Sequence, residues 1–160
     1  MRDVSRRGFM KTSAGLAAVA SMAQGGDSAA DEPPETKQLM AGISARDITP
    51  PPGIPMWGYS DREGPATGTL DPLFAKAVVF RSGASSAAIV TLDLGRTPLP
   101  PVVDRIRARA REKGVEHVAI VATHTHHGPV MESQDAPHVL SIEDGIAEAI
   151  AEAASSLEPV

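Results

Sequence analysis

The chain has 160 residues, which is enough for one domain of ordinary size, and its 42% hydrophobic and 22% charged residues are typical of a globular protein. The formal net charge of −5 combines +3 over the first 25 residues with −8 over the remainder. So acidic a remainder argues against a nucleic-acid-binding protein, because phosphates require a basic surface. The absence of cysteine excludes disulfides, thiolate metal ligands and a cysteine nucleophile.

The N-terminal segment predicts an export signal. Arg6 and Arg7 are followed by an apolar residue and then a lysine, an order that resembles the twin-arginine signal. The short, alanine-rich stretch that follows is too short to span a bilayer, which needs about 20 apolar residues. Small residues favour cleavage after Ala20 or Ala23. We therefore expect a signal peptide over residues 1–23, recognised by the twin-arginine export machinery, and a periplasmic or secreted protein without a transmembrane span. An ordinary amphipathic helix is the alternative.

The next segments predict a linker followed by a strand and a long loop. Residues 24–40 are rich in small, acidic and proline residues, which is typical of a flexible linker, and the folded part is expected over 41–160. A first strand is expected over 42–48, where a run of prolines ends it. The loop over 54–71 is unusually long for a compact domain, and such loops are often functional.

The middle of the chain predicts a hairpin and a crossover. Apolar, β-rich runs at 75–81 and 87–93 flank the turn residues 82–86. A helix is expected over 101–113, because proline is favoured in a first turn, and a buried strand is expected over 117–122. Strand, helix and strand in this order indicate a right-handed crossover between parallel strands.

The C-terminal segment predicts a last helix from Ser141, acting as N-cap, to about residue 156. Glu143 and Asp144 would then lie in its first turn, where the helix dipole favours anions. We expect no further parallel strand after this helix. The fold class is therefore α/β, with a mixed sheet that contains a β-hairpin and a βαβ unit.

Three histidines within four positions follow the expected strand 117–122. His124, His126 and His127 begin at the carboxyl end of that strand, the edge where open α/β sheets bind ligands. Histidines two residues apart in an extended chain can point into the same cleft, and imidazole is a good zinc ligand. Surface histidines with capping threonines are the alternative.

The same stretch, Thr-His-Thr-His-His-Gly-Pro over residues 123–129, resembles the Thr-His-Thr-His-Ser-Gly-Pro stretch of the neutral and alkaline non-lysosomal ceramidases. Other segments match that family in order: 41–43, 47–50, 56–59, 74–80 and 93–95. The resemblance implies the N-terminal portion of the family's catalytic domain. It also implies a zinc-dependent amide hydrolase that cleaves ceramide, or another small or lipid amide, into an amine and a fatty acid.

The resemblance also implies roles for individual residues. His124 matches a zinc ligand, and His126 matches the catalytic histidine beside the metal-bound water. His127 replaces the family's serine and is a candidate extra ligand. Asp93 is a candidate for orienting a ligating imidazole, with a strand-end turn residue as the alternative. The family completes its zinc site with a later histidine, a glutamate and a tyrosine, and nothing in this chain corresponds to them.

Two other functions remain open from the sequence. One is a non-catalytic, truncated fragment that binds zinc weakly. The other is a small exported metal-binding protein that uses the three loop histidines or His138, together with Asp93. His127 and His138 are also expected at the surface, and His117 is expected to be structural. Trp57 and Tyr59 are expected either to cover the core or to pack over a lipid-binding cleft.

Overall fold

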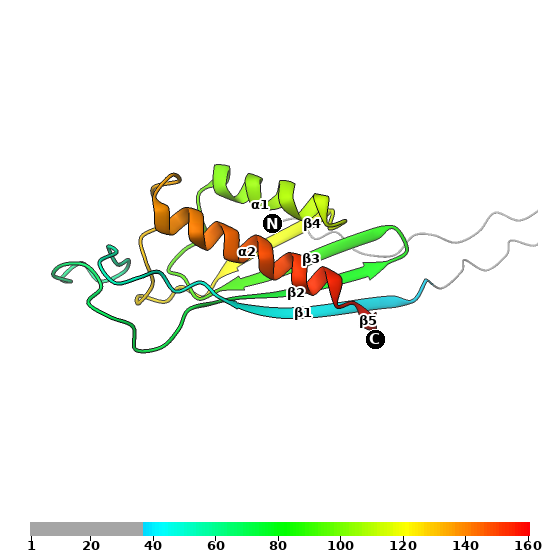
Figure 1. Cartoon of the computed structure of the whole chain (residues 1–160), viewed down its shortest axis with the longest axis horizontal. Coiled ribbons are helices and arrows are strands. Elements are labelled where there is room, and N and C mark those ends of the chain that lie inside the picture. The colour runs from blue at the N-terminus through cyan, green and yellow to red at the C-terminus, as the bar shows by residue number, and fades with distance from the viewer. Residues whose placement is uncertain (1–36) are drawn as a thin grey trace, which may run out of the picture. The chain divides into compact units, whose positions relative to one another are not determined.

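The computed structural model describes residues 37–160, which form a five-stranded mixed sheet and two helices (Figure 1). The expected signal peptide at 1–23 and residues 24–36 of the expected linker lie outside the described residues. Among residues 37–160, neither helix combines the length and the hydropathy that crossing a membrane requires.

The sheet has the strand order β4-β3-β2-β1-β5. The three central strands pair antiparallel, and β3 pairs with β4 in parallel. The strands are β1 at Leu39–Asp47, β2 at Phe74–Ser82, β3 at Ser85–Leu92, β4 at His117–Ala122 and β5 at Glu158–Pro159. The expected mixed sheet, hairpin and crossover are therefore confirmed.

The strands alternate between a covered and an open face of the sheet. In β3, Ala88, Val90 and Leu92 are buried, whereas the residues between them face away from the core. This alternation follows from the two-residue repeat of a strand, which sends successive side chains to opposite faces. On the open face, Ile43 is 76% exposed and Val121 is 53% exposed.

Both helices cover the same face of the sheet (Figure 1). Helix α1 at Pro100–Glu112 packs on β4, and helix α2 at Pro137–Ser155 packs across β1 and β2. Each helix has a proline in its first turn, where the missing N–H has no intrahelical partner to lose. The apolar stripes of the two helices and the covered face of the sheet form one core.

The start of α2 differs from the prediction. The helix begins at Pro137 after Ala136, one turn before Ser141, so Ser141 lies inside the helix and does not cap it. No acidic residue lies in the first turn. Ser141 and Pro137 are both residues with which a helix can begin, and in the structure the helix begins at Pro137.

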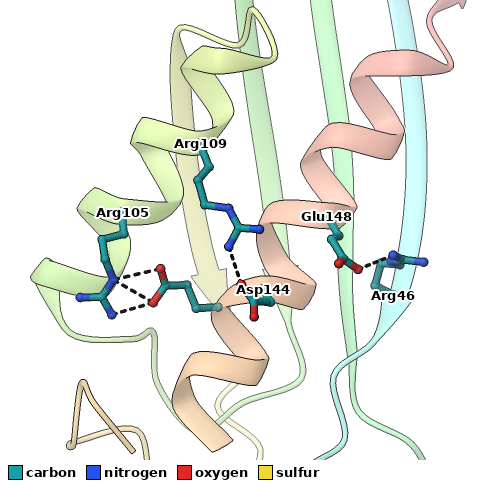
Figure 2. Close-up of polar contacts among 6 residues, drawn as sticks. Arg46, Arg105, Arg109, Asp144 and Glu148 are labelled. Carbon is teal, nitrogen blue, oxygen red and sulfur yellow. Dashed lines mark hydrogen bonds and ion pairs between the residues drawn. The ribbon is translucent and has the colours of Figure 1, made fainter. Parts of the chain in front are cut away.

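Glu143 and Asp144 bind arginines of α1 instead of stabilising the helix dipole. Arg105 donates to the Glu143 carboxylate, with Nε 3.0 Å from Oε1 and Nη2 2.6 Å from Oε2. Figure 2 draws these bonds as dashed lines from the labelled Arg105. The Glu143 side chain is only 7% exposed. This hydrogen bonding to Glu143 raises the pKa of Arg105 above its ordinary value. Arg109 donates to Asp144 at 2.6 Å, so two ion pairs join the helices.

The sheet also contains one strand that the sequence did not predict. The short strand β5 comes after α2 and pairs antiparallel with β1, where Met40 faces Pro159 and Ala41 faces Glu158. It thus extends the sheet at the edge opposite β4. A two-residue strand containing a proline lacks the apolar alternation from which strands are predicted, so the sequence carried little signal for it.

Candidate functional site around the histidine loop

The histidine loop begins where β4 ends, beside the end of β3. The Thr123 N–H donates to the Leu92 carbonyl oxygen at 2.9 Å, which continues the parallel pairing by one residue. The chain then leaves the sheet through residues 124–130. The histidines therefore lie at the carboxyl edge of a parallel strand pair, as the sequence predicted and as is usual for ligand sites in α/β sheets.

The His124 imidazole is oriented by a backbone carbonyl. Its Nδ1 lies 2.9 Å from the Gly95 carbonyl oxygen. Because a carbonyl can only accept a hydrogen bond, Nδ1 carries the proton, and the lone pair of Nε2 is available to a metal. His124 has a φ of 63°, and among residues 37–160 it is the one non-glycine residue with a positive φ. Such strain persists where surrounding contacts fix the conformation, and it concentrates at functional sites.

His126 lies beside His124, and one tryptophan packs against both rings. The two imidazole centroids are 5.2 Å apart. The Trp57 ring centroid lies 4.9 Å from that of His124 and 5.0 Å from that of His126, with the planes nearly perpendicular. These edge-to-face contacts are the favoured geometry for aromatic rings. Trp57 therefore holds the two imidazoles in a fixed relation.

Tyr59 completes the aromatic cluster. Its ring lies 5.1 Å from the His126 ring and 5.5 Å from the His127 ring, measured between centroids. His127 is exposed, as the sequence predicted, whereas His126 is half-buried. The cluster therefore consists of three histidines and two aromatic residues from segments more than sixty residues apart in the chain.

Backbone pairing brings the long loop to the histidines. The Trp57 N–H donates to the Gly128 carbonyl oxygen, and the Val130 N–H donates to the Pro55 carbonyl oxygen, both at 2.9 Å. Gly58 has a φ of 113°, and a Cβ there would lie 2.6 Å from the Cβ of His126. Only glycine fits so close an approach in this conformation.

Two arginines surround the aromatic rings. Arg62 donates from Nη2 to the His126 carbonyl oxygen at 2.7 Å, and its guanidinium carbon lies 5.5 Å from the Tyr59 ring centroid. Arg96 lies over Trp57 at 5.3 Å and forms an ion pair with Glu132 at 3.6 Å. Cationic groups over aromatic faces are attracted by the ring quadrupole.

Three other candidate residues lie outside this cluster. The Asp93 carboxylate accepts a hydrogen bond from the Phe74 N–H at 3.1 Å and so binds the backbone at the start of β2. The His124 imidazole instead donates its hydrogen bond to the Gly95 carbonyl oxygen. His138 is half-buried in the first turn of α2, and its Nε2 lies 2.8 Å from the Val130 carbonyl oxygen, which corrects its expected exposure. His117 is exposed at the opposite end of β4.

The donor set fits zinc in kind but not in number. His124 and His126 offer imidazoles, which zinc binds well, whereas a catalytic zinc site normally has three protein ligands and a water. Within residues 37–160, no group of three or more histidine, aspartate or glutamate side chains is arranged to hold a metal ion. The described part of the chain therefore brings together two neighbouring imidazoles, fewer than the three protein ligands of a catalytic zinc site.

Sequence reasoning missed the residues that build the walls of the site. Trp57 and Tyr59 were expected over the core or a lipid cleft, and Arg62, Gly95 and Arg96 were not singled out. The available signal was the length of the loop 54–71, which favours a functional loop without showing which strand end it reaches.

Comparison with known proteins gives a partial match. No protein-family model matches the chain. The crystal structure of neutral ceramidase from Pseudomonas aeruginosa is 30% identical, with a TM-score of 0.67, over 78% of this chain and 23% of that chain. A ceramidase complexed with C2 is 28% identical, with a TM-score of 0.67, over 77% of this chain and 22% of that chain. The chain thus spans about a quarter of the length of these ceramidases, and its α/β unit is similar in sequence and structure to part of neutral ceramidase.

Proposed function

We propose that this chain supplies one portion of the active site of a zinc-dependent amide hydrolase of the neutral ceramidase type. The observation that carries the proposal is the His124 imidazole, whose Nδ1 is held by the Gly95 carbonyl so that Nε2 is left for zinc. The similarity to part of neutral ceramidase supports the proposed reaction class. The substrate class is a lipid amide such as ceramide, or another small amide.

Each histidine of the pair has a distinct proposed role. His124 binds zinc through Nε2. Zinc held there would supply Lewis-acid chemistry, by polarising the amide carbonyl and activating water as the nucleophile. His126 acts as the general acid that donates a proton to the departing amine nitrogen. Its ring is suited to this role because Trp57 and Tyr59 pack against it and restrict its orientation.

The proposal requires zinc ligands beyond those that residues 37–160 bring together. Two imidazoles are fewer than the three protein ligands of an ordinary catalytic zinc site. A second candidate function is zinc binding through His124 and His126 without turnover of an amide, and it is supported by the 5.2 Å separation of the two imidazole centroids. The two candidates agree on the metal ligand and differ on catalysis.

A metal-binding experiment with a matched control tests the ligand. The full chain is dialysed against zinc, and bound metal is measured by elemental analysis for the wild type, His124→Ala and His117→Ala. His117 is an exposed histidine at the opposite end of β4, so its loss controls for histidine content. We expect His124→Ala to lose the zinc and His117→Ala to keep it. Equal zinc contents in all three proteins would overturn the assignment.

An activity assay separates the two candidates. Release of fatty acid from ceramide is measured by mass spectrometry for the zinc-loaded full chain. Turnover that disappears in both His124→Ala and His126→Ala supports the hydrolase. Stoichiometric zinc with no turnover supports the metal-binding fragment.

We also propose that the protein is exported to the periplasm or beyond by the twin-arginine route. Support for this comes from the sequence alone, where Arg6 and Arg7 precede a short apolar stretch. Cell fractionation of a variant in which Arg6 and Arg7 are both replaced by lysine tests the export proposal.

A further inference from the structure

Arg62 makes a contact with the histidine loop that the proposed roles do not use. Its Nη2 donates to the His126 carbonyl oxygen at 2.7 Å, across 64 positions of sequence. We propose that Arg62 is a positioning residue that fixes the conformation of His126. Its role in catalysis rests on the proposed function, whereas its role in orienting His126 does not.

The hydrogen bond from Arg62 reaches the middle of the histidine loop. The His126 carbonyl lies between His124, which has a positive φ, and Gly128, whose carbonyl oxygen accepts from the Trp57 N–H. Arg62 lies in the long loop 54–71, so this donor reaches the histidine loop from a segment far away in the sequence. A hydrogen bond from a guanidinium is charge-assisted and roughly twice as strong as a neutral one.

The same guanidinium also supports the aromatic wall beside His126. It lies over the Tyr59 ring at 5.5 Å, and that ring packs edge-on against the His126 imidazole at 5.1 Å. Arg62 therefore restrains His126 twice, through its backbone carbonyl and through the ring beside its side chain. These two contacts together restrict the conformations open to the His126 side chain.

Another donor nitrogen of the Arg62 side chain makes no hydrogen bond to the histidine loop. Its Nε is buried and has no hydrogen-bond partner within residues 37–160, and it is the single such side-chain atom in that range. A buried donor without a partner is unfavourable. The contacts of the guanidinium to the described residues near the site are therefore the bond to the His126 carbonyl and the position over Tyr59.

A spectroscopic experiment tests the orienting role without any activity. The full chain, labelled with ¹³C and ¹⁵N, is compared with Arg62→Gln and with Arg111→Gln, a matched change at an exposed arginine of α1. We expect Arg62→Gln to shift the His126 carbonyl and imidazole resonances and to leave those of His117 in place. Arg111→Gln is expected to leave the His126 resonances unchanged.

The conservative variant Arg62→Lys keeps the experiment informative should Arg62→Gln fold poorly, as judged by circular dichroism. Lysine retains the positive charge and one donor but lacks the planar fork, so we expect a smaller shift of the same His126 resonances. Unchanged His126 resonances in a folded Arg62 variant would overturn the proposal. Shifts spread over the whole domain would also overturn it, because they would indicate a general structural role.

Kinetics test the catalytic consequence where the wild type turns over ceramide. We expect Arg62→Gln to lower kcat by about 100-fold, the effect of misplacing a catalytic group by about 1 Å, with KM and zinc content nearly unchanged. A raised KM with an unaltered kcat would contradict positioning. Absence of turnover in the zinc-loaded wild type would favour metal binding without catalysis over hydrolysis by this chain, and the resonances of His126 would still decide the role of Arg62.

Discussion

Replacing Gly95 with alanine is expected to disrupt the histidine site by displacing the Trp57 indole. A Cβ at this buried position would lie 2.0 Å from Cε3 of Trp57, 2.5 Å from its Cδ2 and 2.8 Å from its Cζ3. Carbon atoms in contact prefer about 3.5–4.0 Å, so the indole must retreat by about 1.5 Å or more. That movement breaks edge-to-face contacts with His124 and His126, each worth about 0.5–1.5 kcal/mol.

We therefore expect Gly95→Ala to lower the free energy of unfolding by about 1–3 kcal/mol, the usual range for overpacking a closely packed position. Urea denaturation followed by tryptophan fluorescence measures this directly, because Trp57 is the sole tryptophan of the chain. Its native emission should also change, since the indole itself is displaced.

Gly68→Ala provides the control for the same substitution. A Cβ at Gly68 would meet no atom within 4 Å, and its φ lies outside the left-handed region. We expect this variant to keep the native emission and the wild-type stability within about 1 kcal/mol. An identical emission spectrum and urea midpoint for Gly95→Ala and Gly68→Ala would refute the close packing of Trp57 on Gly95.

Three further predictions concern the helix pair, the response to acid and export. Glu143→Gln should lower the free energy of unfolding by about 1–3 kcal/mol in urea denaturation, because the carboxylate is buried and accepts from its α1 arginine. Glu148→Gln, which breaks an exposed pair, should change it by less than about 1 kcal/mol. Hydrogen bonds from the side chain and backbone of the threonine two residues later hold the pKa of Asp47 below its ordinary 3.8. The stabilisation from Asp47 is therefore complete above that value and is lost as the pH falls through the lowered pKa, so Asp47→Asn should flatten the acid limb of a stability profile. Replacing Arg6 and Arg7 together with lysine should retain the protein in the cytoplasmic fraction of an expressing cell, and unchanged export would contradict the twin-arginine route.

The sheet could be predicted from sequence because its strands carry strong local patterns. Val79 and Val90 lie in apolar runs that alternate with outward-facing residues, and a turn-rich segment separates the two runs. The crossover followed from the order of strand, helix and strand, which has one dominant handedness. The start of α2 was harder because Pro137 and Ser141 both signal a helix N-terminus, and local sequence does not decide between them.

The candidate site could be predicted only in part, because several of its contacts join residues that are far apart in the sequence. His124 and His126 are adjacent to a strand end, so a local pattern placed them correctly. Their contacts to Trp57, Gly95 and Arg62 depend on where a long loop crosses the sheet edge. Such contacts leave no periodic signal in the sequence, and the glycine required beside Trp57 is recognisable only once the two segments are seen together.

The orientation of both imidazoles is set by the fold itself. The Gly95 carbonyl fixes the protonated nitrogen of His124, Trp57 fixes the angle between the two rings, and Arg62 fixes the backbone of His126. Each of these contacts comes from a segment other than the histidine loop. A ligand that binds these imidazoles therefore meets donors already in place and need not order them, which reduces the entropic cost of binding. Variants of the three supporting residues should consequently weaken metal binding less than His124→Ala does, because they loosen a donor without removing it.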